Sequence, residues 1–258
     1  MTILDTILAD KRVEVAESQT RVPLPEMAKR AQQLQRPRAF KPTLEKVPFA
    51  LIAEIKKASP SRGNLVEHFD HRKLAEEFEK GGANALSVLT DRKYFSGDPA
   101  FIQEVKEVVG LPVLRKDFIL DEYQVYESRA LGADAILLIV RALSVENLKK
   151  LLKCAHSLGM DVLVETHNQE EIQVAHSVGA QIVGINNRDL STFQVSLETS
   201  LRLREFVNPG ILVVSESGIH TRNDITALRD AGFRAALVGE GLVTRADRVS
   251  AVRELIPG

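Results

Sequence analysis

The sequence predicts a single (β/α)8 barrel, of the TIM type, preceded by an N-terminal helical extension. Three observations support this fold. Four similar segments recur about every 50 residues, four further apolar runs lie midway between them, and the 258-residue chain has the usual length of one such barrel. Eight strands that alternate with helices in one register imply a parallel sheet closed on itself, with the helices outside.

Residues 1–48 precede this pattern, and residues 49–258 are expected to form the barrel. Apolar residues at helical spacing predict two helices in the extension. The first stripe is Ile3, Leu4, Ile7 and Leu8, and the second, after Pro23 and Pro25, is Leu24, Met27, Ala28, Ala31 and Leu34. We expect both helices to plug the bottom of the barrel or to pack on its side. A place at the active-site mouth is the alternative, which Arg36, Arg38 and Lys41 favour because a basic approach suits an anionic substrate.

Two sets of four segments supply the strands. In the first set a helical pattern ends at a glycine, which is typical of a helix C-cap, and an apolar strand follows. These segments are GGANALSVL at 81–89, LGADAILLI at 131–139, VGAQIVGIN at 178–186 and AGFRAALVG at 231–239. In the second set apolar runs become charged only at their last residues. They are ALIAEIKKAS at 50–59, LPVLRKDF at 111–118, MDVLVETH at 160–167 and ILVVSESG at 211–218.

Amphipathic stretches between the strands predict the outer helices. Examples are residues 72–80, 122–131, 145–158 and 222–231. A doubly wound open sheet is the competing fold, but no G-x-G-x-x-G motif follows any of the eight strands.

Charge and cysteine content argue against several functional classes. The net charge is −1, so no overall field attracts nucleic acid or anionic lipid. Cys154 is the sole cysteine, which excludes an internal disulfide and suits the reducing cytoplasm. No apolar run is long enough to span a membrane. His68 and His71 lie three residues apart, but no further His or Cys completes a metal set and Asp70 is a suitable helix N-cap, so no metal is expected.

Polar and charged residues gather where the predicted strands end, which is where barrels of this type carry their chemistry. Glu54 and Lys56 are two residues apart on the first strand and therefore point to the same side. The other residues of this kind are Lys116, Glu165, Asn186, Arg188 and Glu216 with Ser217. For any one of them an exposed charge is the simpler interpretation. Their joint placement favours an acid–base site, because lysines among carboxylates in a half-buried mouth can exchange protons.

Glycine-rich turns follow the last two predicted strands. Ser217 and Gly218 follow the seventh strand, and Gly239, Glu240 and Gly241 follow the eighth. These are the two loops in which such barrels bind phosphate through backbone N–H groups. Glycine permits the close approach of phosphate oxygens, so a phosphorylated small molecule is the expected partner.

Six motifs carry a family resemblance. They are AEIKKASPS at 53–61, LRKDFILD at 114–121, LVETH at 163–167, INNRDL at 185–190, SESGI at 215–219 and LVGEGL at 237–242. Together they resemble the indole-3-glycerol-phosphate synthases, and the likeness includes the two-helix extension. This family of carboxy-lyases acts in tryptophan synthesis. Its substrate, 1-(2-carboxyphenylamino)-1-deoxyribulose 5-phosphate, closes to an indole with loss of carbon dioxide and water.

The resemblance also implies the site residues. The implied catalytic residues are Glu54, Lys56, Lys116, Glu165, Asn186 and Ser217. The implied substrate-binding residues are Ser59, Phe95, Phe118, Arg188, Leu190, Gly218, Gly239 and Glu240. The last loop departs from the family pattern, because it reads Gly-Glu-Gly where some relatives have a small hydroxyl residue second. A backbone contact to phosphate remains expected there, but a hydroxyl contact does not.

The implied reaction assigns a task to each residue type. Lys116 is the expected acid for ring closure, and Lys56 and Glu165 are the expected acid and base for dehydration, although the two lysines could exchange roles. Glu54 and Asn186 would orient the two ammonium groups. No cofactor is required, and we expect a monomer without nucleic-acid or membrane partners. The alternatives are an Amadori isomerase, which needs only one acid and one base, and a barrel that binds phosphosugars without catalysis.

Overall fold

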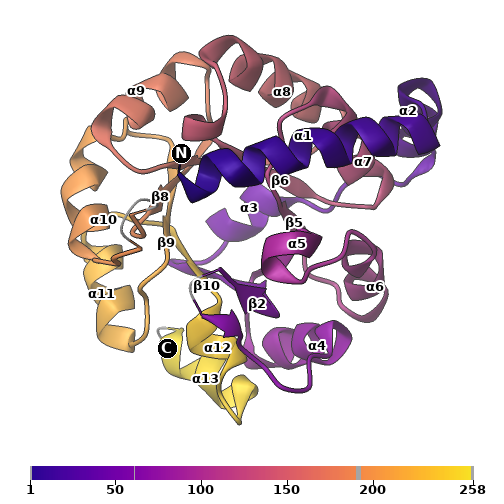
Figure 1. Ribbon diagram of the computed structural model, residues 1–258. Helices are drawn as coiled ribbons and strands as arrows, with labels where there is room; N and C mark the ends of the chain where they lie inside the picture. The colour runs from indigo at the N-terminus through magenta and orange to yellow at the C-terminus, as the bar shows by residue number, and fades with distance from the viewer. Residues whose placement is uncertain (1, 61, 190–192, 257–258) are drawn as a thin grey trace.

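The computed structural model describes residues 2–60, 62–189 and 193–256. Eight parallel strands form a closed barrel, in which each strand pairs with the next and the last pairs with the first (Figure 1). They are β1 Ala50–Ile55, β4 Ala85–Leu89, β5 Val113–Lys116, β6 Ala135–Ile139, β7 Asp161–Thr166, β8 Ile182–Asn186, β9 Leu212–Glu216 and β10 Ala235–Val238. The predicted (β/α)8 fold is therefore confirmed.

Helices surround the barrel and cover the outer face of its strands (Figure 1). The longer ones are α4 His71–Gly81, α6 Ala100–Val108, α7 Glu122–Ala130, α8 Val145–Ser157, α9 Gln169–Ser177, α10 Glu198–Leu203, α11 Arg222–Asp230 and α13 Arg248–Leu255. Short elements are α5 Arg92–Phe95, α12 Glu240–Val243, the 3-10 turns η1 Val140–Ala142 and η2 Arg204–Phe206, and a hairpin of β2 Ala58–Ser59 and β3 Gly63–Asn64. Among the described residues no helix is long and apolar enough to cross a membrane.

The helix caps predicted from the sequence are confirmed. Asp70 caps α4 by accepting hydrogen bonds from the backbone N–H groups of Arg72 and Lys73. Cys154, the sole cysteine, is buried within α8. The glycines expected to end four helices all have positive φ, which favours glycine because no Cβ is present to clash. They are Gly82 at 103°, Gly132 at 91°, Gly179 at 82° and Gly232 at 88°.

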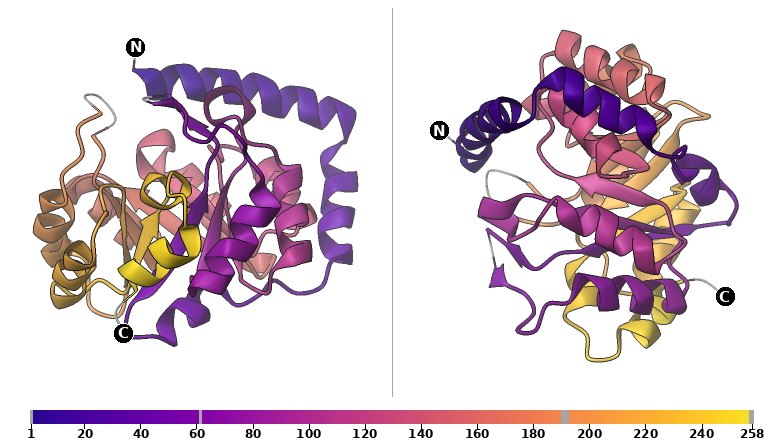
Figure 2. Two further views of the ribbon diagram at one scale, coloured as in Figure 1. Left: turned by 90° about the horizontal axis from the view of Figure 1, so that it is seen from below. Right: turned by 90° about the vertical axis from the view of Figure 1, so that its right-hand side faces the viewer.

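The N-terminal extension follows the expected arrangement only in part, because its second helix packs on the side of the barrel but its first helix does not. Helix α1, Ile3–Arg21, crosses one end of the barrel, and α2, Leu24–Gln33, packs along its side against α7 (Figure 2). A third helix that was not expected, α3 Phe40–Glu45, buries Phe40 and Leu44 among the inner residues of the strands. The bottom plug is therefore α3, which is too short to give a clear periodic signal, and α1 takes the alternative place at the mouth.

The basic residues between α2 and α3 do not approach the mouth. Arg38 donates hydrogen bonds to the backbone carbonyls of Lys106, Val109 and Leu111. Lys41 pairs with Glu45 within α3, and Arg36 is exposed. The basic approach that favoured the alternative placement is therefore not formed by Arg38 or Lys41. Arg38 instead satisfies carbonyl groups near the bottom of the barrel.

Strand alternation determines which side chains meet inside the barrel. The inner apolar cluster includes Ala50 and Ile52 of β1, Leu114 of β5, Leu163 of β7, Ile182 of β8, and Leu212 and Val214 of β9. Residues two positions apart on a strand share a side. The same alternation carries one residue near the end of each of these strands into the upper end of the barrel. Those residues are Glu54, Lys116, Glu165, Asn186 and Glu216.

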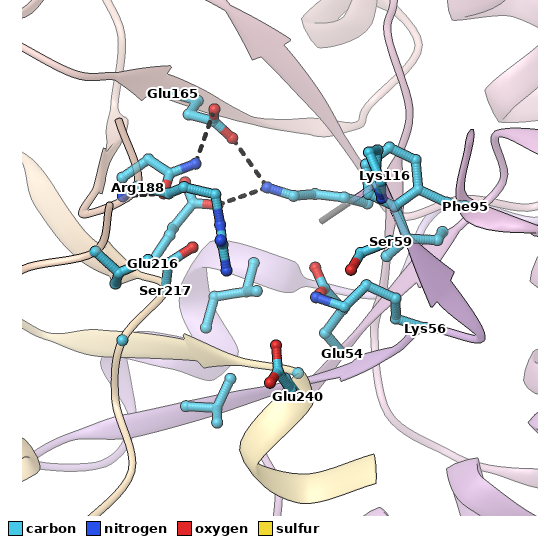
Figure 3. A pocket seen from close by; sticks show the side chains of 18 of the residues that line it. Glu54, Lys56, Ser59, Phe95, Lys116, Glu165, Arg188, Glu216, Ser217 and Glu240 are labelled. Atoms are coloured by element: carbon cyan, nitrogen blue, oxygen red, sulfur yellow. Dashed lines mark hydrogen bonds and ion pairs between the residues drawn. The ribbon is translucent and has the colours of Figure 1, made fainter. Parts of the chain in front are cut away.

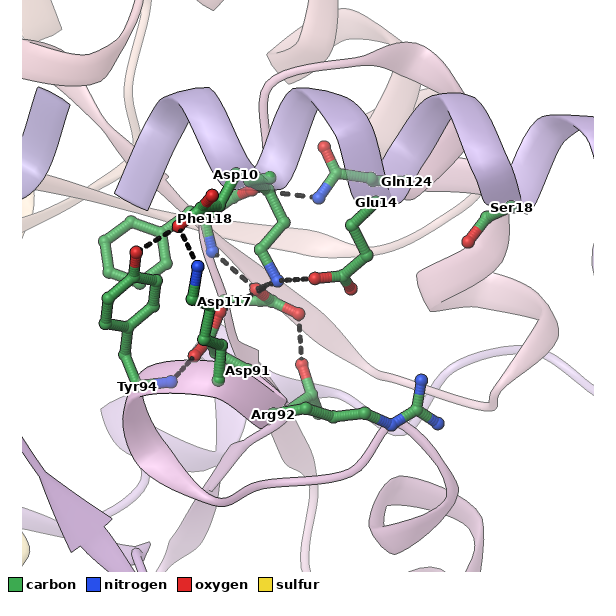
Figure 4. Close-up of polar contacts among 12 residues, drawn as sticks. Asp10, Glu14, Ser18, Asp91, Arg92, Tyr94, Asp117, Phe118 and Gln124 are labelled. Carbon is green, nitrogen blue, oxygen red and sulfur yellow. Dashed lines mark hydrogen bonds and ion pairs between the residues drawn. The ribbon is translucent and has the colours of Figure 1, made fainter. Parts of the chain in front are cut away.

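A buried ion cluster fixes α1 over the barrel (Figure 4). The Lys11 side chain is 1% exposed, and its ammonium lies 2.9 Å from Glu14 Oε2, 2.9 Å from Asp91 Oδ2 and 3.0 Å from Asp117 Oδ1. Burial opposes ionisation of Asp117, but the charges of Arg115 and Lys11 prevail and lower its pKa to about 2. Asp91 follows β4 and Asp117 follows β5, so one lysine joins α1 to two loops at the mouth.

Replacing Lys11 with methionine should strongly destabilise the protein. Asp91 and Asp117 would keep their charges in a buried place without this ammonium, which costs about 3–5 kcal/mol when one partner of a buried pair is removed. Urea unfolding of Lys11→Met and wild type measures the difference. Asp10→Asn is the matched control, because Asp10 lies on the same helix but pairs with the exposed Lys93. Equal stability of Lys11→Met and wild type would contradict a structural role for the cluster.

Candidate active site

A cavity of about 420 Å³ opens at the carboxyl ends of the strands (Figure 3). Every predicted site residue that the structure describes lines it: Glu54, Lys56, Ser59, Phe95, Lys116, Phe118, Glu165, Asn186, Arg188, Ser217, Gly218, Gly239 and Glu240. The remaining predicted residue, Leu190, lies outside the described residues. Ile3, Leu4 and Ile7 of α1 also line the cavity, so the N-terminal helix forms part of its wall.

The ammonium of Lys116 lies at the centre of this site. Its Nζ is 2.9 Å from Glu165 Oε2 and 2.6 Å from Glu216 Oε2 (Figure 3). The three side chains come from β5, β7 and β9, and their exposed fractions are 14%, 5% and 1%. Burial alone would lower the pKa of Lys116, but the two carboxylates outweigh it and hold that pKa above its usual range. Lys116 is therefore an ammonium at neutral pH.

The two glutamates that flank Lys116 differ in basicity. Burial raises the pKa of both carboxyl groups. For Glu165, the charge of Lys116 and a contact with His167 outweigh burial, and its pKa falls well below its usual range. For Glu216, burial and the nearby negative charge of Glu165 outweigh Lys116 and raise its pKa to about 7. The pair therefore holds one exchangeable proton near neutral pH.

A second ammonium lies on the β1 side of the cavity. Lys56 Nζ is 2.7 Å from Glu54 Oε1, as the two-residue spacing predicted. Glu54 is 5% exposed, whereas Lys56 is half-buried. The site thus contains two separate lysine–glutamate groups, one around Lys116 and one at Lys56, which can donate protons at different positions of one bound molecule.

Asn186 has a different partner from the one expected. Its side-chain amide donates a hydrogen bond to Glu165 Oε1 over 3.2 Å, rather than contacting a lysine. A carboxylate that accepts this bond keeps its orientation and remains ionised more readily. Asn186 therefore orients the anionic member of the pair.

Apolar and glycine-rich surfaces complete the cavity. The rings of Phe95 and Phe118 lie with their centroids 6.1 Å apart at 38° and together give the cavity an aromatic wall. Ser217 and Gly218 both have positive φ, of 69° and 74°. A non-glycine residue in this conformation is strained, and such strain is concentrated at functional sites.

Gly239 is needed for a reason that the sequence did not show. A Cβ atom there would lie 2.5 Å from Glu54 Oε1. Any side chain at this position would therefore displace Glu54. The absence of a side chain at Gly239 leaves space for the Glu54 carboxylate. A substitution of Gly239 would therefore disturb Glu54 as well as any phosphate bound to this loop.

Two residues of the site were not among the implied catalytic or binding residues. Glu216 was a strand-end candidate for the acid–base site, and it lines the cavity, but the resemblance gave it no role. His167 ends the motif at 163–167, but its contacts depend on Glu171 of α9, and no local pattern reveals them.

Comparisons with known proteins agree with this geometry. The family model described as indole-3-glycerol phosphate synthase matches residues 4–255. A protein of that name from Chlorobium luteolum is 50% identical over 246 residues, which cover 95% of this chain and 94% of that protein. Its counterpart from Roseiflexus sp. strain RS-1 is 48% identical over 263 residues, with 98% of each chain covered. The chain belongs to the indole-3-glycerol phosphate synthase family.

Membership in the synthase family confirms the resemblance carried by the six motifs. Solved structures of more distant barrels share the fold alone. One of 3-hexulose-6-phosphate synthase has a TM-score of 0.67 at 17% identity, and the match covers 80% of this chain and 98% of that one.

Glu216→Gln tests the proton held between the two glutamates. When Glu216 is protonated, Lys116 has one fewer negative neighbour and releases its own proton more easily. When Glu216 is ionised, the Lys116 ammonium holds its proton more firmly. Because the pKa of Glu216 is raised to about 7, turnover by wild type should decline as the pH rises through that value. The variant, which stays neutral here, should show no such decline between about pH 6 and pH 8. A decline of the same size in both proteins would assign the titration to another group.

Proposed function

We infer that this chain catalyses the reaction for which its family is named. It is a carboxy-lyase of tryptophan biosynthesis that converts 1-(2-carboxyphenylamino)-1-deoxyribulose 5-phosphate to indole-3-glycerol phosphate, carbon dioxide and water. The observation that carries the assignment of residues is the presence of two lysine–glutamate groups in one cavity. An Amadori isomerase needs only one acid and one base, so the second lysine favours the longer synthase reaction.

Ring closure is the first step. The ring carbon that bears the carboxylate attacks the ketone carbon of the ribulose chain, and the ketone oxygen gains negative charge as the carbon–carbon bond forms. Lys116 donates a proton to that oxygen, which becomes a hydroxyl. Phe95 and Phe118 hold the aromatic ring. The proton shared by Glu165 and Glu216 lies close enough to restore the ammonium.

Loss of carbon dioxide and water completes the indole. When the carbon–carboxylate bond breaks, its electron pair returns to the six-membered ring and restores aromaticity. Lys56 then protonates the departing hydroxyl, and Glu165 removes the remaining proton from the carbon next to nitrogen. Glu54 holds Lys56, and Asn186 holds Glu165, so each proton is transferred at a fixed place.

The substrate phosphate is assigned to the loops that follow β9 and β10. Gly218, Gly239 and Gly241 line the cavity there, and Ser217 adopts a glycine-like backbone conformation beside them. Backbone N–H groups suit a dianion because they donate hydrogen bonds and carry a partial positive charge. Arg188 also lines the cavity, as a binding residue. Ring closure, decarboxylation and dehydration, as assigned above, are carried out by side chains of this chain. We assign the enzyme to the cytoplasm and expect it to be a monomer.

The direct test is conversion of the named substrate. The sequence contains no tryptophan, so the fluorescence of an indole product rises against little protein background. Purified protein and substrate should give a steady increase in indole fluorescence, with one carbon dioxide released per indole formed. Substrate loss without an indole would support the isomerase, and tight binding without conversion would support a phosphosugar-binding barrel.

The same assay tests the phosphate position. Gly241→Asp brings a carboxylate to the loop and should raise KM for the phosphorylated substrate by about tenfold or more through repulsion. A dephospho analogue should react poorly with wild type and should be little affected by the change, because both alterations remove the same contact. Gly241→Ala is the matched control, since a Cβ there meets its nearest neighbour at an ordinary 3.4 Å. Equal impairment of both substrates by Gly241→Asp would place the phosphate elsewhere.

A further inference from the structure

The proton held beside Lys116 can reside on either of two glutamates, Glu165 or Glu216. They approach the same ammonium at 2.9 Å and 2.6 Å, and both are almost fully buried. Two buried carboxylates that face one cation share a proton readily, because both cannot ionise at low cost. Both carboxylates face Lys116, and the contacts of their other oxygens differ.

The second oxygen of Glu165 has two polar neighbours. Asn186 donates to Glu165 Oε1 over 3.2 Å, and His167 Nε2 lies 3.3 Å from the same atom. Among the described residues His167 Nε2 has no hydrogen-bond partner of good geometry, so its contact with Glu165 is mainly electrostatic. An imidazolium at this distance favours the ionised form of Glu165.

The second oxygen of Glu216 lacks such neighbours. Among the described residues Glu216 Oε1 has no hydrogen-bond partner, although it is buried. It lies against Gly184, where a Cβ atom would come within 2.1 Å. An unpartnered buried carboxylate oxygen is costly when charged, so a proton is more stable on Glu216 than on Glu165.

His167 is held as a cation by a chain of charges. Its Nδ1 lies 3.1 Å from Glu171 Oε2 of α9, and its backbone N–H donates to the same oxygen. Arg141 of η1 binds the other oxygen of Glu171 over 3.0 Å. Burial alone would lower the pKa of His167, but Glu165 and Glu171 outweigh it and raise that pKa to about 9. Within the described part of the chain, Lys116 of β5 and Glu216 of β9 lie beyond Glu165, and the charge of Glu54 of β1 acts on both of them.

We propose that His167 is a positioning residue that keeps Glu165 anionic and thereby places the shared proton on Glu216. Glu165 then stays available as the base, and protonated Glu216 stays available to resupply Lys116. The inference rests on the proposed function for the roles of base and acid. The asymmetry itself rests on the contacts of the two unshared oxygens.

The test compares His167→Gln with wild type across pH. Glutamine is neutral, so Glu165 loses a cationic neighbour and competes for the shared proton, which blocks the base. At pH 6, where the pair holds that proton, kcat should fall about tenfold, whereas KM should change less than about threefold. Above about pH 8 both glutamates are ionised in either protein, and the difference in kcat should narrow. A merely structural defect would not disappear at high pH.

Two further variants complete the experiment: one restores a positive charge at position 167, and the other replaces a histidine far from the cavity. His167→Lys returns a cation beside Glu165 and should recover most of the kcat lost at pH 6. His71→Gln is the control, because His71 pairs with Glu104 on the outer helices and does not line the cavity; its kcat profile should match wild type. If His167→Gln does not fold, His167→Asn takes its place, with thermal unfolding measured for every variant.

Two results would overturn the proposal. One is an unchanged kcat profile in a folded His167→Gln or His167→Asn. The other is a folded His167→Lys as slow as the glutamine variant at pH 6, which would mean that charge is not what matters. Wild-type turnover in the same assay keeps either result separate from the proposed function, because an inactive wild type would refute the function itself.

Discussion

The buried ammonium of Lys116 between Glu165 and Glu216 is the interaction on which the site depends. Each of these charges would be costly inside the barrel alone, and together they compensate one another. The arrangement requires β5, β7 and β9 to end at the same height with matching alternation. A shift of one residue in any of these strands would turn its charged side chain toward the helices. The closed barrel therefore determines the chemistry of its upper end.

The end of β5 also anchors the N-terminal helix α1. Lys116 points into the cavity, whereas Arg115 and Asp117 on either side of it point outward to a second buried ion cluster that includes Lys11 of α1. Helix α1 contributes Ile3, Leu4 and Ile7 to the cavity wall. Residues 115–117 thus connect the acid of the proposed reaction to the helix that covers the mouth. Correct placement of α1 and correct placement of Lys116 are coupled through this short segment.

The sequence was sufficient for the barrel and for most of the site, because both depend on local patterns. Apolar runs that gain charge at their last residue located Glu54, Lys116 and Glu165, and strand alternation brought them together. The positions of α1 and α3 could not be read in this way, since they depend on packing against strands far away in the chain. The role proposed for His167 likewise requires Glu171 and Glu165 to be adjacent in space, which the motif alone does not reveal.

The most direct test of this account is the rate of ring closure without the central ammonium. The double change Lys116→Met with Glu216→Gln is measured above about pH 8, where Glu216 is ionised in the wild type, so that it removes one charge of each sign and folding is not lost through an uncompensated carboxylate. Single-turnover formation of the indole should slow by about 10² or more relative to Glu216→Gln alone, while affinity for an analogue with the ketone reduced to an alcohol changes less than about threefold. Ring closure within a few-fold of the rate of Glu216→Gln, in a folded protein, would contradict the assignment of Lys116 as the acid.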